Sequence, residues 1–395
     1  MKLITAVLLA SLALTACTST PDYGRPLPEG WPALIELGPD EARPAFGPQW
    51  RDREDILPAL ERSIAWTRTK HSTRFFPIEN IAHDRALASL ERMRELLLDS
   101  RSEEEFELAL ASEFSVYKSA GWDGEGGGVL FTGYCTPILA GRLERGGEYQ
   151  HPLYALPDDL VKGEDGAILG QQTASGVAPY PTRRAIESSS LLADRQLELV
   201  WLRDPLDAFI AHVNGSAFIE LADGERLGFG YAGKNGREYT SLGKELVRDG
   251  QLGANEVSLA RIRSWAGEHP DRVAEYLNRN DSFVFFTPLS GNPRGSLNVE
   301  VSSGRSLATD KTLFPRGAPV FVSTLLVSAE GREQVYQRFL FDQDTGGAIR
   351  TAGRADIYMG IGPEAERLAG QTQAEGQLYY LFLKPELLAL RELAQ

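Results

Sequence analysis

Cysteine and histidine are scarce in this sequence, and basic side chains are fewer than acidic ones. Its 395 residues include two cysteines and five histidines, and 41 lysines and arginines stand against 55 aspartates and glutamates, for a formal net charge of -14. The histidines show neither metal-ligand spacing nor a His-x-x-x-His pair, so we expect no metal and no other cofactor. An acidic chain is repelled by nucleic acid and by anionic lipid, which argues against both as electrostatic partners. A neutral or sugar-rich ligand is compatible with this charge.

Long apolar runs are also rare. Residues 3–14, after Lys2, form a run too short for a membrane span and typical of a signal peptide. It ends in Leu-Thr-Ala-Cys17, which resembles the lipobox of bacterial lipoproteins, and Thr18 resembles the residue that follows in lipoproteins of the Gram-negative outer membrane. We expect residues 1–17 to be a lipoprotein signal peptide, with the mature protein facing the periplasm from a lipid on Cys17. A signal peptide without lipidation, or a short anchor, is the alternative.

Lipidation of Cys17 would leave Cys135 without a disulfide partner in an oxidising compartment. A reactive thiol near a binding cleft is one interpretation of Cys135. A small buried hydrophobic residue is the other, and it is the more common role of a lone cysteine. We assign Cys135 no chemistry.

The chain changes character from helical to β-rich. A hydrophobic content of 42% and a charged content of 24% are ordinary for a globular protein of one or two domains. Residues 18–50 are rich in Pro, Gly and Thr and predict a tether that becomes ordered where it meets the first domain. Apolar residues at helical spacing then predict helices over 55–70, 81–98 and 102–117. Later apolar runs are short and separated by turns, which favours a closed β-barrel in a mainly β, α+β protein.

Three aspartates, Asp342, Asp344 and Asp356, lie among glycines and apolar residues in the stretch 341–362, FDQDTGGAIRTAGRADIYMGIG. Alternation around Asp356 predicts a strand that is at least half buried, so desolvation would raise the pKa of this carboxyl toward the range of a general acid. Asp344 precedes a Gly-Gly turn where backbone can approach a ligand. In the alternative interpretation, Asp344 caps the turn and Asp356 only anchors Arg354 or Arg350.

The same stretch carries a family resemblance. DQDTGGAI followed by RADIYMGIGPEAERLAG resembles the C-terminal signature of the MltA family of membrane-bound lytic murein transglycosylases. Further motifs of that family occur in its order over about residues 130–385; they lie at 132–161, 199–216, 230–250 and 278–286. By position, Asp310, Asp344 and Asp356 are similar to the three aspartates that name the family's last module.

The resemblance implies a fold. It predicts a double-psi β-barrel catalytic domain with N-terminal helices, built from residues 51–135 and 291–395. A smaller, β-barrel-like, glycan-binding domain would be inserted at residues 136–290. A glycan cleft would lie between the two domains, where clefts often occur.

The resemblance also implies an activity. Members of the family cleave the β-1,4 bond between N-acetylmuramic acid and N-acetylglucosamine in peptidoglycan without water and form 1,6-anhydromuramyl products. Asp356 would be the single acid and base, with Asp344 in support and Asp310 more remote. A murein hydrolase that uses Asp344 to activate water, and a non-catalytic murein-binding lipoprotein, stay open as alternatives. The outer membrane, through the lipid anchor, and other cell-wall enzymes are further candidate partners.

Five residues are candidates for substrate binding. Tyr134 could stack on a sugar ring, and Thr136 has the most telling family position. Asn214 stands where the family carries Gln, and Ser216 is kept. Lys234 could bind the acidic lactyl or peptide groups of murein, or could be a solvated turn lysine.

Overall fold

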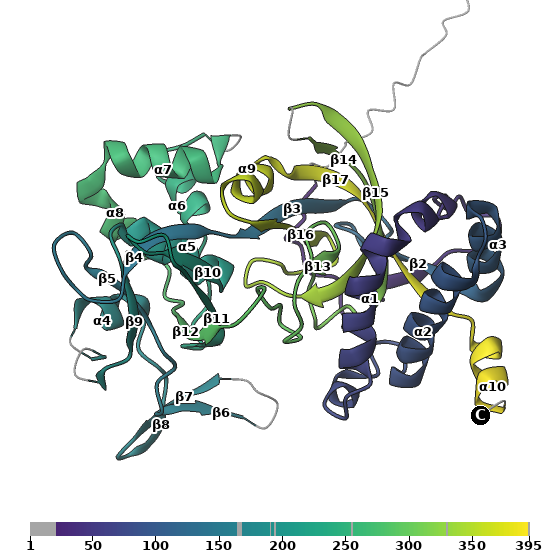
Figure 1. Ribbon diagram of the computed structural model, residues 1–395, viewed down its shortest axis with the longest axis horizontal. Helices are drawn as coiled ribbons and strands as arrows, with labels where there is room; N and C mark the ends of the chain where they lie inside the picture. Colours follow the sequence, from purple (N-terminus) through teal and green to yellow (C-terminus); the bar gives the residue numbers. More distant parts are fainter. Residues whose placement is uncertain are drawn as a thin grey trace, which may run out of the picture.

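The computed structural model describes residues 21–163, 168–189, 191–192, 195–253, 256–328 and 331–393. The expected signal peptide and Cys17 lie outside these ranges. Figure 1 shows three parts in a row: a helical layer, a central sheet and a lobe formed by the middle of the chain. Among the described residues, no helix is both long enough and apolar enough to cross a bilayer.

The central sheet joins strands from the two ends of the chain. Its order is β1-β2-β17-β14-β15-β13-β16-β3, and β17 pairs in addition with β3. Two pairings, β13 with β15 and β16 with β3, are parallel, and the others are antiparallel. The strands are β1 (Leu34–Glu36), β2 (Phe114–Ser119), β3 (Val129–Thr136), β13 (Ser306–Ala308), β14 (Pro319–Val327), β15 (Glu333–Asp344), β16 (Arg354–Ile361) and β17 (Gln373–Leu383).

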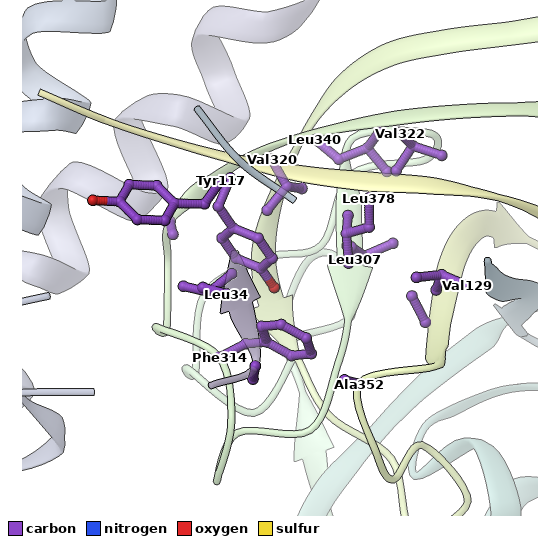
Figure 2. Close-up of a cluster of buried hydrophobic side chains, with 14 of the residues drawn as sticks. Leu34, Tyr117, Val129, Leu307, Phe314, Val320, Val322, Leu340, Ala352 and Leu378 are labelled. Carbon is purple, nitrogen blue, oxygen red and sulfur yellow. The ribbon is translucent and has the colours of Figure 1, made fainter. Parts of the chain in front are cut away.

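Alternating side chains of this sheet enter two apolar clusters. Val320 and Val322 of β14 belong to the cluster in Figure 2, together with Leu307 and Phe314. Phe321, between them, belongs to a second cluster with residues of the helical layer. The two-residue period of a strand separates the faces in this way. The helices of the layer and of the C-terminal region are η1 (Gly47–Asp52), α1 (Arg53–Thr67), η2 (Ser72–Phe75), α2 (His83–Asp99), α3 (Glu103–Glu113), α9 (Pro363–Gln371) and α10 (Pro385–Leu393).

Two expected boundaries differ from the structure. The third helix was expected to reach Tyr117, but α3 ends at Glu113 and β2 begins at Phe114. Pairing of β2 with β17 and β1 overrides the helical pattern there. Within the segment expected as a tether, β1 pairs with β2, and Ala33 is buried.

The lobe formed by the middle of the chain contains a six-stranded sheet of order β12-β11-β10-β4-β9-β5. Strands β10 and β11 form an antiparallel hairpin with its turn at Asp223-Gly224. A small sheet of β6, β7 and β8 projects from the lobe (Figure 1). The elements are β4 (Ile138–Arg142), β5 (His151–Tyr154), β6 (Leu160–Lys162), β7 (Ile168–Thr173), β8 (Gly176–Ala178), α4 (Arg183–Ser188), β9 (Glu198–Leu202), α5 (Pro205–Asn214), β10 (Ala217–Glu220), β11 (Arg226–Lys234), α6 (Leu242–Arg248), α7 (Leu259–Glu268), α8 (Pro270–Leu277) and β12 (Val284–Leu289).

A buried ion pair lies within the central sheet. Lys311 and Asp342 are paired and 5% and 0% exposed. Asp342 also accepts hydrogen bonds from the hydroxyls of Thr309 (2.7 Å to Oδ2) and Tyr380 (2.8 Å). Two buried charges of opposite sign hold one another, and either one alone would be uncompensated.

We expect Asp342→Ala or Lys311→Met to lower the free energy of unfolding by about 3–5 kcal/mol, because each leaves its partner's charge buried and unpaired. The double variant Lys311→Met/Asp342→Leu should recover most of this loss. Urea unfolding followed by circular dichroism measures all three. An equal loss in the single and double variants would show that the charges are not the cause.

Candidate active site

Strand β13 brings Asp344 and Asp356 together. Ala308 of β13 pairs with Asp344 on one side and with Asp356 on the other. Asp356 pairs in turn with Thr132 of β3. Directly opposed residues of neighbouring strands project from the same face of a sheet. The two aspartates therefore share one face, with the small side chain of Ala308 between them.

Asp356 carries an oxygen that lacks a partner. Its side chain is partly exposed, but Oδ1 is buried and accepts no hydrogen bond. Burial raises the pKa of Asp356 to about 6, Arg354 opposes this rise, and the charge of Asp344 adds to it. No ion pair joins Asp356 to Arg354 or Arg350 in the described ranges, and Arg354 donates instead to Thr132 Oγ1 (3.2 Å). Asp356 is thus a carboxyl that can hold a proton near neutral pH.

Asp344 is held in place by donors. Tyr134 Oη donates to Oδ2 (2.8 Å), and the amides of Ser296 and Thr345 donate to Oδ1 (both 2.8 Å). Burial raises the pKa of Asp344, while these hydrogen bonds oppose the rise. The contact with Thr345 is to the next residue of the chain, so it does not cap the Gly346-Gly347 turn. Three donors fix the orientation of the carboxylate and favour its charged form.

Asp310 is engaged elsewhere. Its Oδ1 accepts from the amide (3.0 Å) and hydroxyl (2.7 Å) of Thr312, and its Oδ2 accepts from the amide of Thr351 (3.1 Å). Thr351 has a positive φ of 76°. Asp310 thus stabilises the loop between β15 and β16. It is not one of the paired residues Asp344, Ala308 and Asp356 that lie side by side across three strands.

Thr136 and Ser216 lie together where β3 meets the lobe. Thr136 Oγ1 is 3.1 Å from Ser216 Oγ and 3.0 Å from Tyr358 Oη, and all three residues are buried. Tyr358 also packs on Tyr134, with ring centroids 5.1 Å apart. The hydroxyls are therefore largely used within the protein, whereas the Tyr134 ring borders Asp344.

Asn214 and Lys234 differ in their contacts. Asn214 Nδ2 donates to the carbonyl of Ile210 in its own helix (3.0 Å). The Lys234 side chain has no hydrogen bond or ion pair to any described residue, and burial lowers its pKa. Cys135 is buried, as expected for a structural thiol, and burial raises its pKa to about 12.

Tyr239 and Tyr358 were not predicted as site residues. A Cβ atom on Gly347 would lie 3.3 Å from Tyr239 Cβ, so this tyrosine of the lobe meets the Gly-Gly turn. Its pKa is raised by burial and by the charge of Asp356. No spacing in the sequence links Tyr239 to residues more than a hundred positions away. Tyr358, two residues after Asp356 on the same strand, could have been found from the two-residue period.

Chemically, the site offers one carboxyl that can carry a proton and one that three hydrogen-bond donors orient. Tyr134 contacts Asp344, and Tyr239 brings the lobe to the turn that follows Asp344. In the described part of the chain, no three His, Cys, Asp or Glu side chains are grouped to hold a metal ion. The arrangement suits acid–base chemistry on a neutral, hydroxyl-rich ligand.

Comparison with known families gives two matches. Residues 130–287 match the MltA specific insert domain, and residues 305–382 match the 3D domain. These matched ranges correspond to the lobe and to the part of the central sheet that holds the aspartates.

Known proteins are similar over most of the chain. Membrane-bound lytic murein transglycosylase A of Escherichia coli K12 is 35% identical over 67% of this chain and 69% of its own length. The protein of that name from Vibrio cholerae is 34% identical over 65% and 66%. The crystal structure of a membrane-bound lytic murein transglycosylase from Agrobacterium tumefaciens superposes with a TM-score of 0.76 at 26% identity and covers 91% of this chain and 99% of its own. E. coli MltA with bound chitohexaose superposes with a TM-score of 0.67 at 27% identity over 92% and 96%.

The pKa of Asp356 predicts how Asp356→Asn alters stability. Because the pKa is raised to about 6 from 3.8, the folded protein binds more protons than the unfolded chain between these values, and stability falls as pH rises through that window. Asn keeps the shape without the charge. We expect the variant to gain melting temperature over the wild type above pH 6 and to lose this advantage at pH 4. Thermal unfolding at both pH values is the measurement, with the exposed Asp40→Asn as a control; an advantage that does not change with pH would contradict the burial of the charge.

Proposed function

The chain belongs to the MltA family, and from that premise we propose that it is a lytic murein transglycosylase that acts on peptidoglycan. The observation that carries the proposal is Asp356, whose buried Oδ1 has no partner and whose pKa of about 6 suits a general acid. The similarity to E. coli MltA, which has been crystallised with chitohexaose, supports a glycan as the ligand.

We further propose the course of the reaction. Asp356 donates its proton to the oxygen between N-acetylmuramic acid and N-acetylglucosamine, and the bond from this oxygen to the muramyl anomeric carbon breaks. The muramyl 6-hydroxyl attacks that carbon, and its proton passes to Asp356. A 1,6-anhydro ring forms, no water is consumed, and the acid is regenerated. One carboxyl can serve both steps because it is neutral in the first and charged in the second.

Asp344 is the proposed supporting carboxylate. Three donors orient it, and in the proposed role its charged form stabilises positive charge that develops at the anomeric carbon. Its charge also favours the protonated form of Asp356. Asp310 acts at a greater distance, through the loop that it anchors. Tyr134, Thr136, Asn214, Ser216 and Lys234 are the proposed contacts or supports of the glycan.

The proposed fold assigns these roles to two domains. The pairings from β17 through β14, β15, β13, β16 and β3 back to β17 support a double-psi β-barrel. In this proposal residues 51–135 and 291–395 form the barrel domain with its helices, and residues 136–290 form the inserted glycan-binding domain. The glycan cleft of this proposal lies where the two domains meet, beside the contact of Tyr239 with the turn at Gly347.

The products of digestion test the activity. Wild-type protein should release muropeptides one water lighter than hydrolytic products from purified sacculi, and Asp356→Asn should lower this rate by at least about 100-fold because the proton donor is lost. Asp344→Asn should lower it less. Mass spectrometry of the soluble products gives the readout, and Asp40→Asn is the matched control.

Three outcomes would contradict this proposal. Products with reducing ends would indicate a hydrolase in which Asp344 activates water. Binding to sacculi without any product would indicate a non-catalytic binding protein. Full activity of Asp356→Asn would mean that another group is the acid.

The proposed location is the periplasmic face of the outer membrane, through a lipid on Cys17. Relatives are named membrane-bound, which supports an anchor of some kind. We expect Cys17→Ser to move the full-length protein from the outer-membrane fraction to the soluble periplasmic fraction, because a thioether-linked lipid cannot form. Immunoblots of the separated fractions measure this. Retention of the variant in the membrane fraction would refute the lipid anchor. Contact with other cell-wall enzymes would then depend on a different attachment to the membrane.

A further inference from the structure

Two cationic side chains, one from the lobe and one from a loop of the central sheet, lie within electrostatic range of each other. Lys234 is the last residue of β11 in the lobe, and Arg350 lies in the loop between β15 and β16. Burial and, to a smaller degree, the charge of Arg350 lower the pKa of Lys234. Like charges repel, and an anion bound between them would relieve this repulsion.

The backbone of Lys234 is fixed by strand pairing, whereas its ammonium group has no partner among the described residues. It pairs with Val284 of β12, and the next residue, Asn235, is 2% exposed and donates to the carbonyls of Pro181 (2.9 Å) and Asp281 (2.8 Å). The half-buried Lys234 side chain has no hydrogen bond or ion pair to any residue in the described ranges. A cation that is partly removed from water and unpaired is suited to an external anion.

Arg350 is similarly placed. Ile349 on one side is buried, and the amide of Thr351 on the other is fixed by Asp310. The Arg350 side chain is 56% exposed, and its Nη1 lies 3.9 Å from Asp310 Oδ1. That oxygen already accepts two hydrogen bonds from Thr312. Asp310 therefore neutralises Arg350 only in part and leaves most of its N–H donors available.

We propose that Lys234 and Arg350 together bind a carboxylate carried by the muramyl residue of the substrate. This inference rests on the proposed function and adds a determinant of substrate choice to it. The carboxylate belongs either to the free lactyl group of a peptide-free strand or to the peptide stem. Chitin oligosaccharides carry neither group. A cationic pair in a protein of net charge -14 draws this one anionic feature to the edge of the cleft.

The position of the pair fits this assignment. Arg350 shares its loop with the Gly346-Gly347 turn that begins two residues after Asp344, and Tyr239, which meets that turn, follows Lys234 by five residues. The contact of Tyr239 with the turn thus brings the segment that carries Lys234 to the loop that carries Arg350. Because they come from different parts of the chain, the anion would also hold the two sides of the cleft together.

Binding to the inactive Asp356→Asn protein tests the proposal without turnover. Isothermal titration calorimetry would compare three ligands: a peptide-bearing muramyl tetrasaccharide, the same tetrasaccharide without peptide, and chitohexaose. We expect Lys234→Gln and Arg350→Gln each to reduce the preference for the muramyl ligand over chitohexaose by about threefold to tenfold, since each removes one partly exposed charge. Lys234→Arg and Arg350→Lys should keep most of the preference.

The source of the carboxylate follows from which ligand is affected. A reduced preference for the peptide-bearing ligand assigns the site to the stem, and a reduced preference for the peptide-free ligand assigns it to the lactyl group. The exposed Lys244→Gln is the control for general charge and should leave both ratios at the parent value. Ratios in the Lys234 and Arg350 variants equal to those of the parent overturn the proposal. Failure of the proposed activity has a separate sign, the absence of anhydro products from the wild type.

Discussion

The short strand β13 is the constraint on which the site depends. It pairs with β15 and β16 at once, so Ala308 has Asp344 as its neighbour on one side and Asp356 on the other. Two strand spacings place the Cα atoms of the aspartates about 10 Å apart. At this separation the carboxyls influence one another but do not share a proton. Accordingly, burial is the main cause of the raised pKa of Asp356, and the charge of Asp344 is a smaller one.

The buried Oδ1 of Asp356 has no hydrogen-bond partner, which lowers the stability of the fold. The surrounding structure must therefore be stable enough to keep this oxygen in place. Strand β15 lies between two apolar clusters, one of which includes α1 and α2, and Ala355 and Ile357, on either side of Asp356 in β16, belong to the other. Two residues before Asp344 in β15, Asp342 forms the buried pair with Lys311. This pair joins the turn after β13 to β15. Rigid packing around the site keeps Asp356 from moving into water, where its pKa would return to the ordinary range.

The sequence predicted the environment of Asp356 along its own strand better than it predicted which residues of other strands lie beside Asp356. Alternation in ADIYMG correctly places Asp356 on a half-buried strand, because a two-residue period is visible in a short segment. The pairing of Ala308 with both aspartates depends on strand order, which no local pattern encodes. Asp310, chosen by family position, instead bonds Thr312 and Thr351. The end of α3 was misplaced since sheet pairing outweighs helical propensity at Phe114.

The lobe is attached directly to the strands that flank the acid. Ser216, between α5 and β10, contacts Thr136 of β3, and Thr136 contacts Tyr358 of β16. A second attachment is Arg263 of α7, which pairs with Asp207 (2.6 Å) of α5 and Glu366 (3.2 Å) of α9. Both attachments lie on the side of β16 that leads to α9. A third contact lies at the other end of β16, where Tyr239 of the lobe meets the turn at Gly347. The lobe therefore touches the central sheet at both ends of the strand that carries Asp356, and these contacts fix the surroundings of that carboxyl.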